Sequence, residues 1–400
     1  MIACAGSLWA TEKNTENRSK FMKNLILRVG SKVYRSLEAQ KNFASNSLAN
    51  VNFLNGGLSV REDRIDNERH KEIIKRIVSS YHSAKTDQSK ATLPYKPGGA
   101  WKEDIEKRHA EYLKALNAKD FDRLSELLRN FFRNNGVAGL WTHGYYGDIH
   151  NANNTKKKKF INDILQDYST VIDFVDNFDI SNLKIPLVGN PWGYIIQETL
   201  VLPTACRHYY YASHVHNLLE DVSRPVVGEI GGGFGGFAYY LLSSNKEIKY
   251  INFDLPEVLL IMQYFLMSAF PEKRFLLYGE DGHQSISEVL NKYDVILMPN
   301  FALPNVKDKA VDLFINTGSL SEMDYHTVEE YINQIARTTK KYFYHENSDR
   351  PSLNTGGYIE VVSSKFPIPH DILKRIYKTN SLWGGGGGRY REHLYQRKEA

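Results

Sequence analysis

Glu229-Ile230-Gly231-Gly232-Gly233-Phe234-Gly235-Gly236 decides the fold of this 400-residue chain. The apolar run Pro225-Val226-Val227 precedes it and the apolar run Phe237–Leu242 follows it, which predicts a strand, a glycine turn and a helix. Glycine leaves room for a ligand beside the backbone, and the first N–H groups of the helix point at that ligand. The stretch therefore predicts a site for a nucleotide-type cofactor.

The glycine spacing fits two kinds of cofactor. Gly231, Gly233 and Gly236 match the G-x-G-x-x-G pattern of dinucleotide sites. Gly231, Gly233 and Gly235, with Glu229 two places before them, resemble motif I of class I S-adenosylmethionine-dependent methyltransferases. A carboxylate at position 229 orients the turn or meets the positive methionine end of that cofactor. A glycine turn that binds nothing is the third alternative.

An acidic residue follows the turn at the end of the next predicted strand. Lys249–Phe253 is the strand, and Asp254 lies at its carboxyl end, about 20 residues after the turn, where an acidic residue meets ribose hydroxyls. A helix N-cap before Pro256 is the alternative role of Asp254. Phe253-Asp254-Leu255-Pro256 resembles a segment common among small-molecule O-methyltransferases, which favours S-adenosylmethionine over a nicotinamide.

Strands and helices alternate from Arg224 to about Asn347, which predicts an α/β fold with a doubly wound parallel sheet. Both Arg274–Tyr278 and Asp294–Pro299 are candidates for the third core strand. The expected domains are a helical or irregular N-terminal extension (1–100), a helical, aromatic-rich acceptor-binding region (101–223) and a Rossmann-like cofactor domain (224–400).

Composition excludes several classes of protein. The chain is 42% hydrophobic, enough for a large core, and its two cysteines make neither a disulfide framework nor a zinc site. A net charge of +5 without a concentrated basic patch argues against a nucleic-acid partner. No apolar run has transmembrane length, so we expect a cytoplasmic protein. The sequence leaves homo-oligomer formation open.

Aromatic residues, histidines, glycines and prolines gather between Gly139 and Tyr211. Sugar-binding surfaces favour such residues, because aromatic faces stack on pyranose rings and polar side chains meet hydroxyls. Arg207, His208 and Tyr210 are the candidate substrate contacts. For any single one of these aromatic residues, packing in the hydrophobic core is the favoured alternative.

Residues from about 185 to 350 resemble a family of sugar O-methyltransferases. The resemblance lies in Gly189–Pro191, Arg207–Tyr210, Glu229–Gly235, Phe253–Pro256 and Asn316–Met323, and the last segment is the most specific to that family. It implies a Rossmann-like methyltransferase domain, S-adenosylmethionine as donor and a carbohydrate hydroxyl as acceptor.

The carboxyl ends of the predicted strands supply the remaining candidates. Asn316 joins the cofactor-binding set, and Asp324 joins the substrate-binding set. An alcohol needs a general base before it attacks a methyl group, and His345 and Glu322 rank equally for that role. Further candidates for the general base are His326, Asp324, His143 and His208. A Mg²⁺ ion is also possible, with Glu322, Asp324 and Glu346 as its oxygen ligands.

Two other functions remain as alternatives at this stage. A nicotinamide-dependent oxidoreductase shares the glycine turn. A methyltransferase-like protein without catalytic activity shares the fold and binds a glycan or another partner.

Overall fold

The computed structural model describes residues 52–53, 66–137, 146–244, 247–281, 285–351, 359, 361–383 and 389–399. The predicted site residue His143, residues 1–51 of the N-terminal extension and the glycines at 384–388 lie outside this part of the chain.

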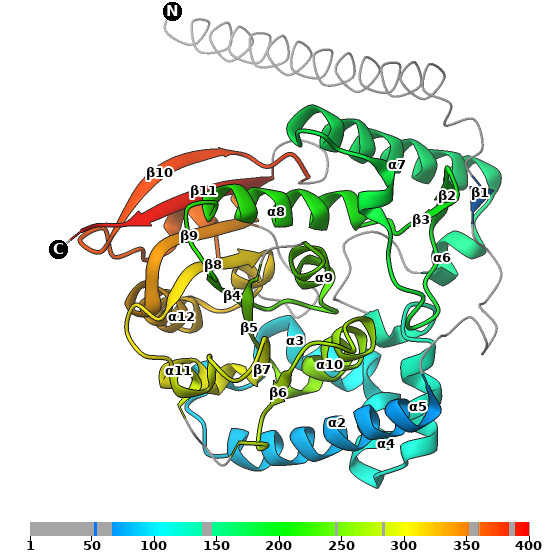
Figure 1. Cartoon of the computed structure of the whole chain (residues 1–400), viewed down its shortest axis with the longest axis horizontal. Coiled ribbons are helices and arrows are strands. Elements are labelled where there is room, and N and C mark those ends of the chain that lie inside the picture. The colour runs from blue at the N-terminus through cyan, green and yellow to red at the C-terminus, as the bar shows by residue number, and fades with distance from the viewer. Residues whose placement is uncertain are drawn as a thin grey trace, which may run out of the picture.

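An eight-stranded sheet in the order β10-β11-β9-β8-β4-β5-β7-β6 forms the centre of the molecule (Figure 1). Its strands are β4 (Val226–Ile230), β5 (Lys249–Asp254), β6 (Phe275–Leu277), β7 (Val295–Pro299), β8 (Val311–Thr317), β9 (Thr339–Ser348), β10 (Leu373–Asn380) and β11 (Tyr390–Arg397). The pairs from β6 to β9 are parallel, whereas β11 runs antiparallel to both β9 and β10. The α/β prediction is confirmed.

The helices come mainly before the sheet and between its strands. They are α2 (Asn67–Gln88), α3 (Gly99–Arg108), α4 (Ala110–Ala118), α5 (Phe121–Arg129), α6 (Tyr146–His150), α7 (Asn154–Phe174), α8 (Ala205–Leu218), α9 (Gly236–Leu242), α10 (Pro256–Ala269), α11 (Ile286–Val289) and α12 (Tyr325–Thr338). A small sheet joins β1 (Asn52–Phe53), β2 (Tyr194–Ile196) and β3 (Thr199–Val201).

Apolar strands separate two hydrophobic cores. Every residue of β7 is buried, as expected for a parallel strand covered on both faces. Helices α8, α9 and α10 contribute to one core, and α11 and α12 contribute to the other. Twelve residues of α10 are buried, so this helix is covered nearly all round. Strand β7 lies next to β5, so Asp294–Pro299 supplies the third core strand and β6 forms the edge.

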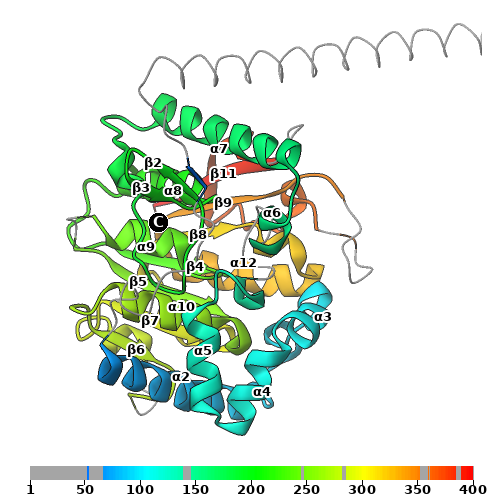
Figure 2. The ribbon, with the colours of Figure 1, turned by 90° about the vertical axis from the view of Figure 1, so that its right-hand side faces the viewer.

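The N-terminal helices pack against the cofactor-domain segment. Figure 2 shows α2, α4 and α5 together below the sheet, and α2 contacts α10. Arg76 of α2 also pairs at 2.6 Å with Glu280, which follows β6. The domain boundaries at residues 100 and 223 stay a prediction.

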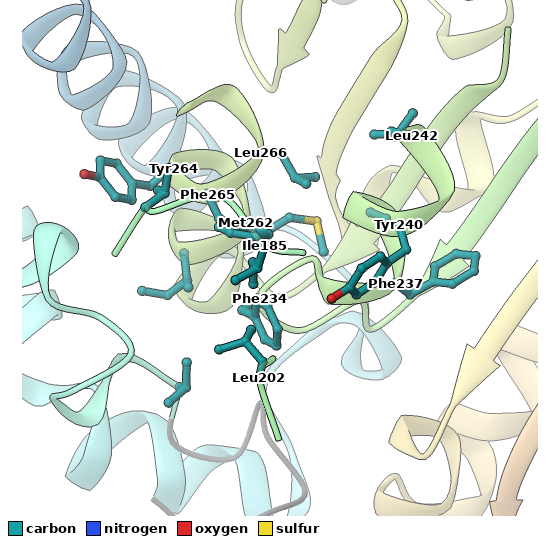
Figure 3. Close-up of a cluster of buried hydrophobic side chains, with 14 of the residues drawn as sticks. Ile185, Leu202, Phe234, Phe237, Tyr240, Leu242, Met262, Tyr264, Phe265 and Leu266 are labelled. Carbon is teal, nitrogen blue, oxygen red and sulfur yellow. The ribbon is translucent and has the colours of Figure 1, made fainter. Parts of the chain in front are cut away.

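The glycine turn is anchored in the larger core by Phe234. This side chain is 1% exposed and lies among Ile185, Leu202, Met262 and Phe265 (Figure 3). Its ring centroid is 5.5 Å from that of Phe265. Burial of one large side chain therefore fixes a turn whose other residues are glycine.

None of the described helices is long and apolar enough to cross a membrane. The expected cytoplasmic location stays a prediction.

Candidate active site

A pocket of about 170 Å³ opens along the carboxyl ends of four neighbouring strands. These strands lie in the order β8, β4, β5, β7. Neighbouring strands are about 4.8 Å apart, so the row of strand ends spans roughly 14 Å. The chain leaves β7 and returns on the other side of β4 as β8, and ligands of open α/β sheets bind where the strand order reverses in this way.

The glycine turn forms the floor of the pocket. The Gly231 N–H donates to the Phe253 carbonyl at 2.9 Å, and Gly231 has a φ of +70°. A Cβ at Gly231 would collide with the Ser319 hydroxyl, and a Cβ at Gly236 would collide with the His208 ring. Gly231 and Gly233 line the pocket, whereas Gly235 precedes α9 outside the lining.

Glu229 contributes a buried carboxyl to the pocket. Its side chain is 2% exposed and accepts a hydrogen bond from the Tyr250 hydroxyl. Burial raises the pKa of Glu229 to about 8; the Asp254 carboxylate adds to this effect and the Tyr250 hydrogen bond opposes it. A cation arriving beside Glu229 would favour its ionised form.

Asp254 ends β5 and faces the same pocket. Its Oδ1 accepts from the Leu255 N–H at 2.7 Å. Burial raises the pKa of Asp254 to about 7, while hydrogen bonds from the N–H groups of Leu255 and Gly233 oppose the rise. The N-cap of α10 is Leu255 rather than Asp254, so the alternative helix-cap role does not apply.

The exit of β8 forms one end wall. Thr317, Ser319 and Glu322 line the pocket there, and Glu322 ends the 3₁₀ turn η5 (Ser319–Glu322). Glu322 Oε2 accepts a hydrogen bond from the Trp101 indole N–H at 2.9 Å. Of the two residues expected as general base, Glu322 therefore lies in the pocket.

His345 lies outside it. Strand β9 runs on to Ser348, because β8 pairs with it on one side and β11 on the other, so residue 345 is inside the strand rather than at its end. The fully buried His345 ring stacks on His393, with centroids 4.5 Å apart. Burial holds the pKa of His345 well below its usual value. The structure thus corrects the expectation that His345 reaches the site.

Asn316 supports the site from behind instead of lining it. Its Nδ2 donates to the Ile230 carbonyl at 2.9 Å and to the Ser319 hydroxyl at 2.5 Å. Its Oδ1 accepts from Asn347 Nδ2 at 2.8 Å. This fully buried side chain ties together the ends of β4, β8 and β9 and is not part of the pocket lining.

The first turn of α8 brings two expected substrate contacts to the pocket, Arg207 and His208. Arg207 Nε donates to the Tyr211 hydroxyl at 2.9 Å, and its Nη2 lies 3.4 Å from Glu346 Oε2. Thr204, just before the helix, lines the pocket, is 2% exposed and has no hydrogen-bond partner for its hydroxyl among the described residues.

Tyr210 points elsewhere, which corrects its expected place in the site. Its ring is parallel to that of His214, with centroids 6.1 Å apart, and it also packs on Trp383. Arg207 and Tyr210 share a face of α8, but Tyr210 lies one turn further along the helix axis, where it packs on His214 and Trp383 instead of lining the pocket.

The three carboxylates considered for Mg²⁺ are not brought together as ligands. Asp324 lines the rim and caps α12 through Thr327. Glu346 is fully buried, outside the lining, and accepts from the Ser381 hydroxyl at 2.6 Å. Within the described ranges no group of three His, Cys, Asp or Glu side chains could hold a metal ion. His326 is exposed on α12, away from the pocket.

Sequence reasoning missed several lining residues. Asn300 follows the end of β7 and donates to the Tyr331 hydroxyl at 2.9 Å. The rule that led to Asp254 would also have found Asn300, because both residues lie at strand ends. Other lining residues come from distant segments and carry no local signal: Pro94, Lys96, Gly98, Trp101 and Tyr390.

No family model matches the sequence, and no curated protein matches it either. Solved structures that it resembles include methyltransferases. Mitomycin 7-O-methyltransferase MmcR is 15% identical over 49% of this chain and 56% of its own, with a TM-score of 0.34. The N-methyltransferase NodS of Bradyrhizobium japonicum WM9, bound to S-adenosyl-L-homocysteine, is 11% identical over 58% of this chain and 99% of its own, with a TM-score of 0.32.

Magnesium protoporphyrin IX methyltransferase (ChlM) of Synechocystis PCC 6803 with bound SAM is 13% identical over 48% of this chain and 81% of its own, with a TM-score of 0.32. The chain spans little more than half of MmcR. The three proteins differ in acceptor. The α/β fold of this chain is assigned from its own strand order.

Replacing Glu229 with Gln should remove part of the pH dependence of stability. The folded chain keeps a proton on Glu229 up to about pH 8, whereas the unfolded carboxyl loses it near its ordinary pKa of 4.5. The wild-type free energy of unfolding therefore carries a contribution from Glu229 that falls as pH rises through this window. Urea unfolding of both proteins at several pH values within the window checks this, and identical slopes would contradict it.

Proposed function

We propose that this chain is an S-adenosylmethionine-dependent O-methyltransferase that methylates a hydroxyl of a sugar or glycan. The observation that carries the proposal is the pocket lined by Glu229, the glycine turn and Asp254, at the point where the strand order reverses. These residues come from two strands and the turn between them, and each matches a group of this cofactor.

The order of the strand ends suggests how the cofactor is held. Asp254 accepts hydrogen bonds from the ribose hydroxyls, because a carboxylate can bind both oxygens of a vicinal diol. Asn300, which follows β7, and Leu255, which follows Asp254, would border the base. The methionine portion then lies over the glycine turn, toward β8 and α8.

Charge favours this cofactor over a dinucleotide. The pyrophosphate of a nicotinamide cofactor beside the buried Glu229 carboxyl would raise the pKa of that carboxyl further and gain no attraction from it. A cofactor with a sulfonium and an ammonium group has the opposite charge and stabilises ionised Glu229. The NAD-dependent alternative is therefore the weaker one.

Thr204 and the start of α8 supply donors for the methionine carboxylate. The Thr204 hydroxyl is buried, lines the pocket and lacks a partner among the described residues, and α8 has no side-chain cap on its first N–H groups. An unsatisfied buried hydroxyl costs free energy, and a bound carboxylate would satisfy it. The positive end of the 14-residue helix also favours an anion.

The acceptor would bind at the β8 end, between Glu322, His208 and Trp101. The bound cofactor supplies a methyl group on a sulfonium sulfur for in-line attack by the acceptor oxygen. Glu322 accepts the proton of the acceptor hydroxyl as general base. The Trp101 indole N–H donates to Glu322 Oε2 and holds the carboxyl group in position for this role. His208 is the second candidate, since it also lines this end.

Two observations support a sugar as the acceptor. The sequence segment from Asn316 to Met323 resembles that of sugar O-methyltransferases, and its residues Thr317, Ser319 and Glu322 line the acceptor end. Aromatic residues Trp101 and Tyr390 lie beside hydrogen-bonding groups there, a combination that suits a pyranose ring with its hydroxyls.

S-adenosylhomocysteine should raise the melting temperature of the protein, and NAD should not, because a ligand stabilises the fold it binds. In the same assay, Asp254→Asn should weaken the S-adenosylhomocysteine effect by removing an acceptor for the ribose hydroxyls. A rise with NAD alone would refute the methyltransferase proposal, and equal binding by the Asp254→Asn variant would refute the ribose role.

Thr204→Val should have opposite effects on stability and binding. Valine has nearly the same shape but no hydroxyl, so the change removes an unsatisfied buried group and should not destabilise the free protein. It should nevertheless weaken S-adenosylhomocysteine binding at least about 10-fold, the value of a hydrogen bond to a carboxylate. Calorimetric titration measures the affinity, and an unchanged affinity would exclude Thr204 as a ligand contact.

Glu322→Gln should lower the methyl-transfer rate by about 10²- to 10⁴-fold, the usual contribution of a general base, in a protein that still binds S-adenosylhomocysteine. The assay follows tritiated methyl transfer from S-adenosylmethionine to a panel of simple glycosides, sugar phosphates and nucleotide sugars. His208→Asn is the matched comparison. A larger loss in the His208 variant than in the Glu322 variant would assign the base to His208.

A further inference from the structure

The segment that follows α2 and runs into the first turn of α3 lies along the pocket. Residues 94–101, which we call the strap, contribute four lining residues, Pro94, Lys96, Gly98 and Trp101. The rest of the lining comes from the sheet, α8, α12 and the turns between them. One wall of the site is therefore built by a part of the chain more than 120 residues before the glycine turn.

The first end of the strap is fixed at the β7 side. Tyr95 is 4% exposed, its ring lies 5.6 Å from that of Tyr331, and its hydroxyl donates to Glu330 at 2.8 Å. Tyr331 lines the pocket and accepts a hydrogen bond from Asn300, which follows β7.

The second end is fixed at the β8 side, where the Trp101 indole N–H donates to Glu322 at 2.9 Å. The strap thus runs along the same row of strand ends as the pocket. Five residues lie between its two anchors: the four steps from Tyr95 to Gly99 reach about 14 Å when extended and the two helical steps to Trp101 add about 3 Å, enough for the roughly 14 Å between β8 and β7.

Hydrogen bonds fix the turn that carries Glu322, whereas few backbone bonds are described for the strap. The turn that carries Glu322 is held by Ser321, whose N–H and hydroxyl both donate to Asn347 Oδ1 at 3.1 Å. The strap's backbone bonds that the structure describes are local: the N–H groups of Tyr95 and Lys96 donate to Thr92 and Leu93. Side chains rather than backbone therefore attach the strap to the sheet, and the strap can move without breaking the sheet.

We propose that the strap is the retaining gate of the cofactor site and that the Trp101–Glu322 hydrogen bond keeps it closed. The inference rests on the proposed function, which supplies the ligand. A cofactor along the strand ends lies beneath the strap along its whole length. It leaves when the Trp101 end swings away, so breaking this one bond speeds release.

Stopped-flow measurement of S-adenosylhomocysteine dissociation tests the gate. Trp101→Phe keeps an aromatic ring but loses the indole N–H, and should raise the dissociation rate at least about 10-fold, as expected for a hydrogen bond to a carboxylate. Tyr95→Phe, which loses the bond to Glu330, should raise it as well. Hydrogen exchange should show that S-adenosylhomocysteine protects the amides of residues 98–101 in the wild type and less so in the Trp101→Phe variant.

Trp383→Phe is the matched control. This tryptophan packs on Tyr210 outside the pocket, so the same chemical change should leave dissociation unaltered. Unchanged dissociation rates in both strap variants, with S-adenosylhomocysteine still bound and the fold intact by circular dichroism, would overturn the gate alone. A wild-type protein that does not bind S-adenosylhomocysteine would overturn the proposed function and the gate together.

Discussion

Two glycines, Gly231 directly after β4 and Gly236 at the start of α9, are the constraint on which the rest of the structure depends. Ser319 presses on Gly231 from the β8 side, and His208 presses on Gly236 from α8. Only hydrogen atoms at those positions allow three separate segments to meet at one turn. Phe234, between them, does the opposite and fills the core below. The close approach brings the β8 exit and α8 to the same pocket.

A buried amide network continues this constraint beyond the turn. Asn316 and Asn347 bond to each other and to groups on three strand ends, and Ser321 joins them to the turn that carries Glu322. In an apolar interior such a network is stable only when every member is satisfied, because one missing partner leaves buried polar groups unpaired. Residues without ligand contact thus determine where the acidic group at the acceptor end stands.

The sequence predicted features that depend on local pattern. The strand before the glycine turn and Asp254 at the end of β5 both follow from apolar runs and turn residues. It misplaced or missed features that depend on contacts between residues far apart in the sequence. His345 is internal because β11 extends β9, and Trp101 reaches Glu322 from 221 residues away. Neither contact leaves a periodic signal near the residue concerned, and residue type alone favoured a histidine as base.

The position of β11 has a consequence for how the sheet is assembled. It lies between β9 and β10, although β10 precedes it in the chain, and the described pairing of β10 is with β11 alone. Until β11 is available, β9 is an open edge and β10 has no neighbour to bond. During synthesis β11 follows every other strand of the sheet, so the antiparallel side is completed last; its pairing with β10 is local, whereas a parallel pair such as β4–β8 joins distant parts of the chain and closes more slowly. During synthesis the exposed edge of β9 would be the surface most in need of protection from other chains.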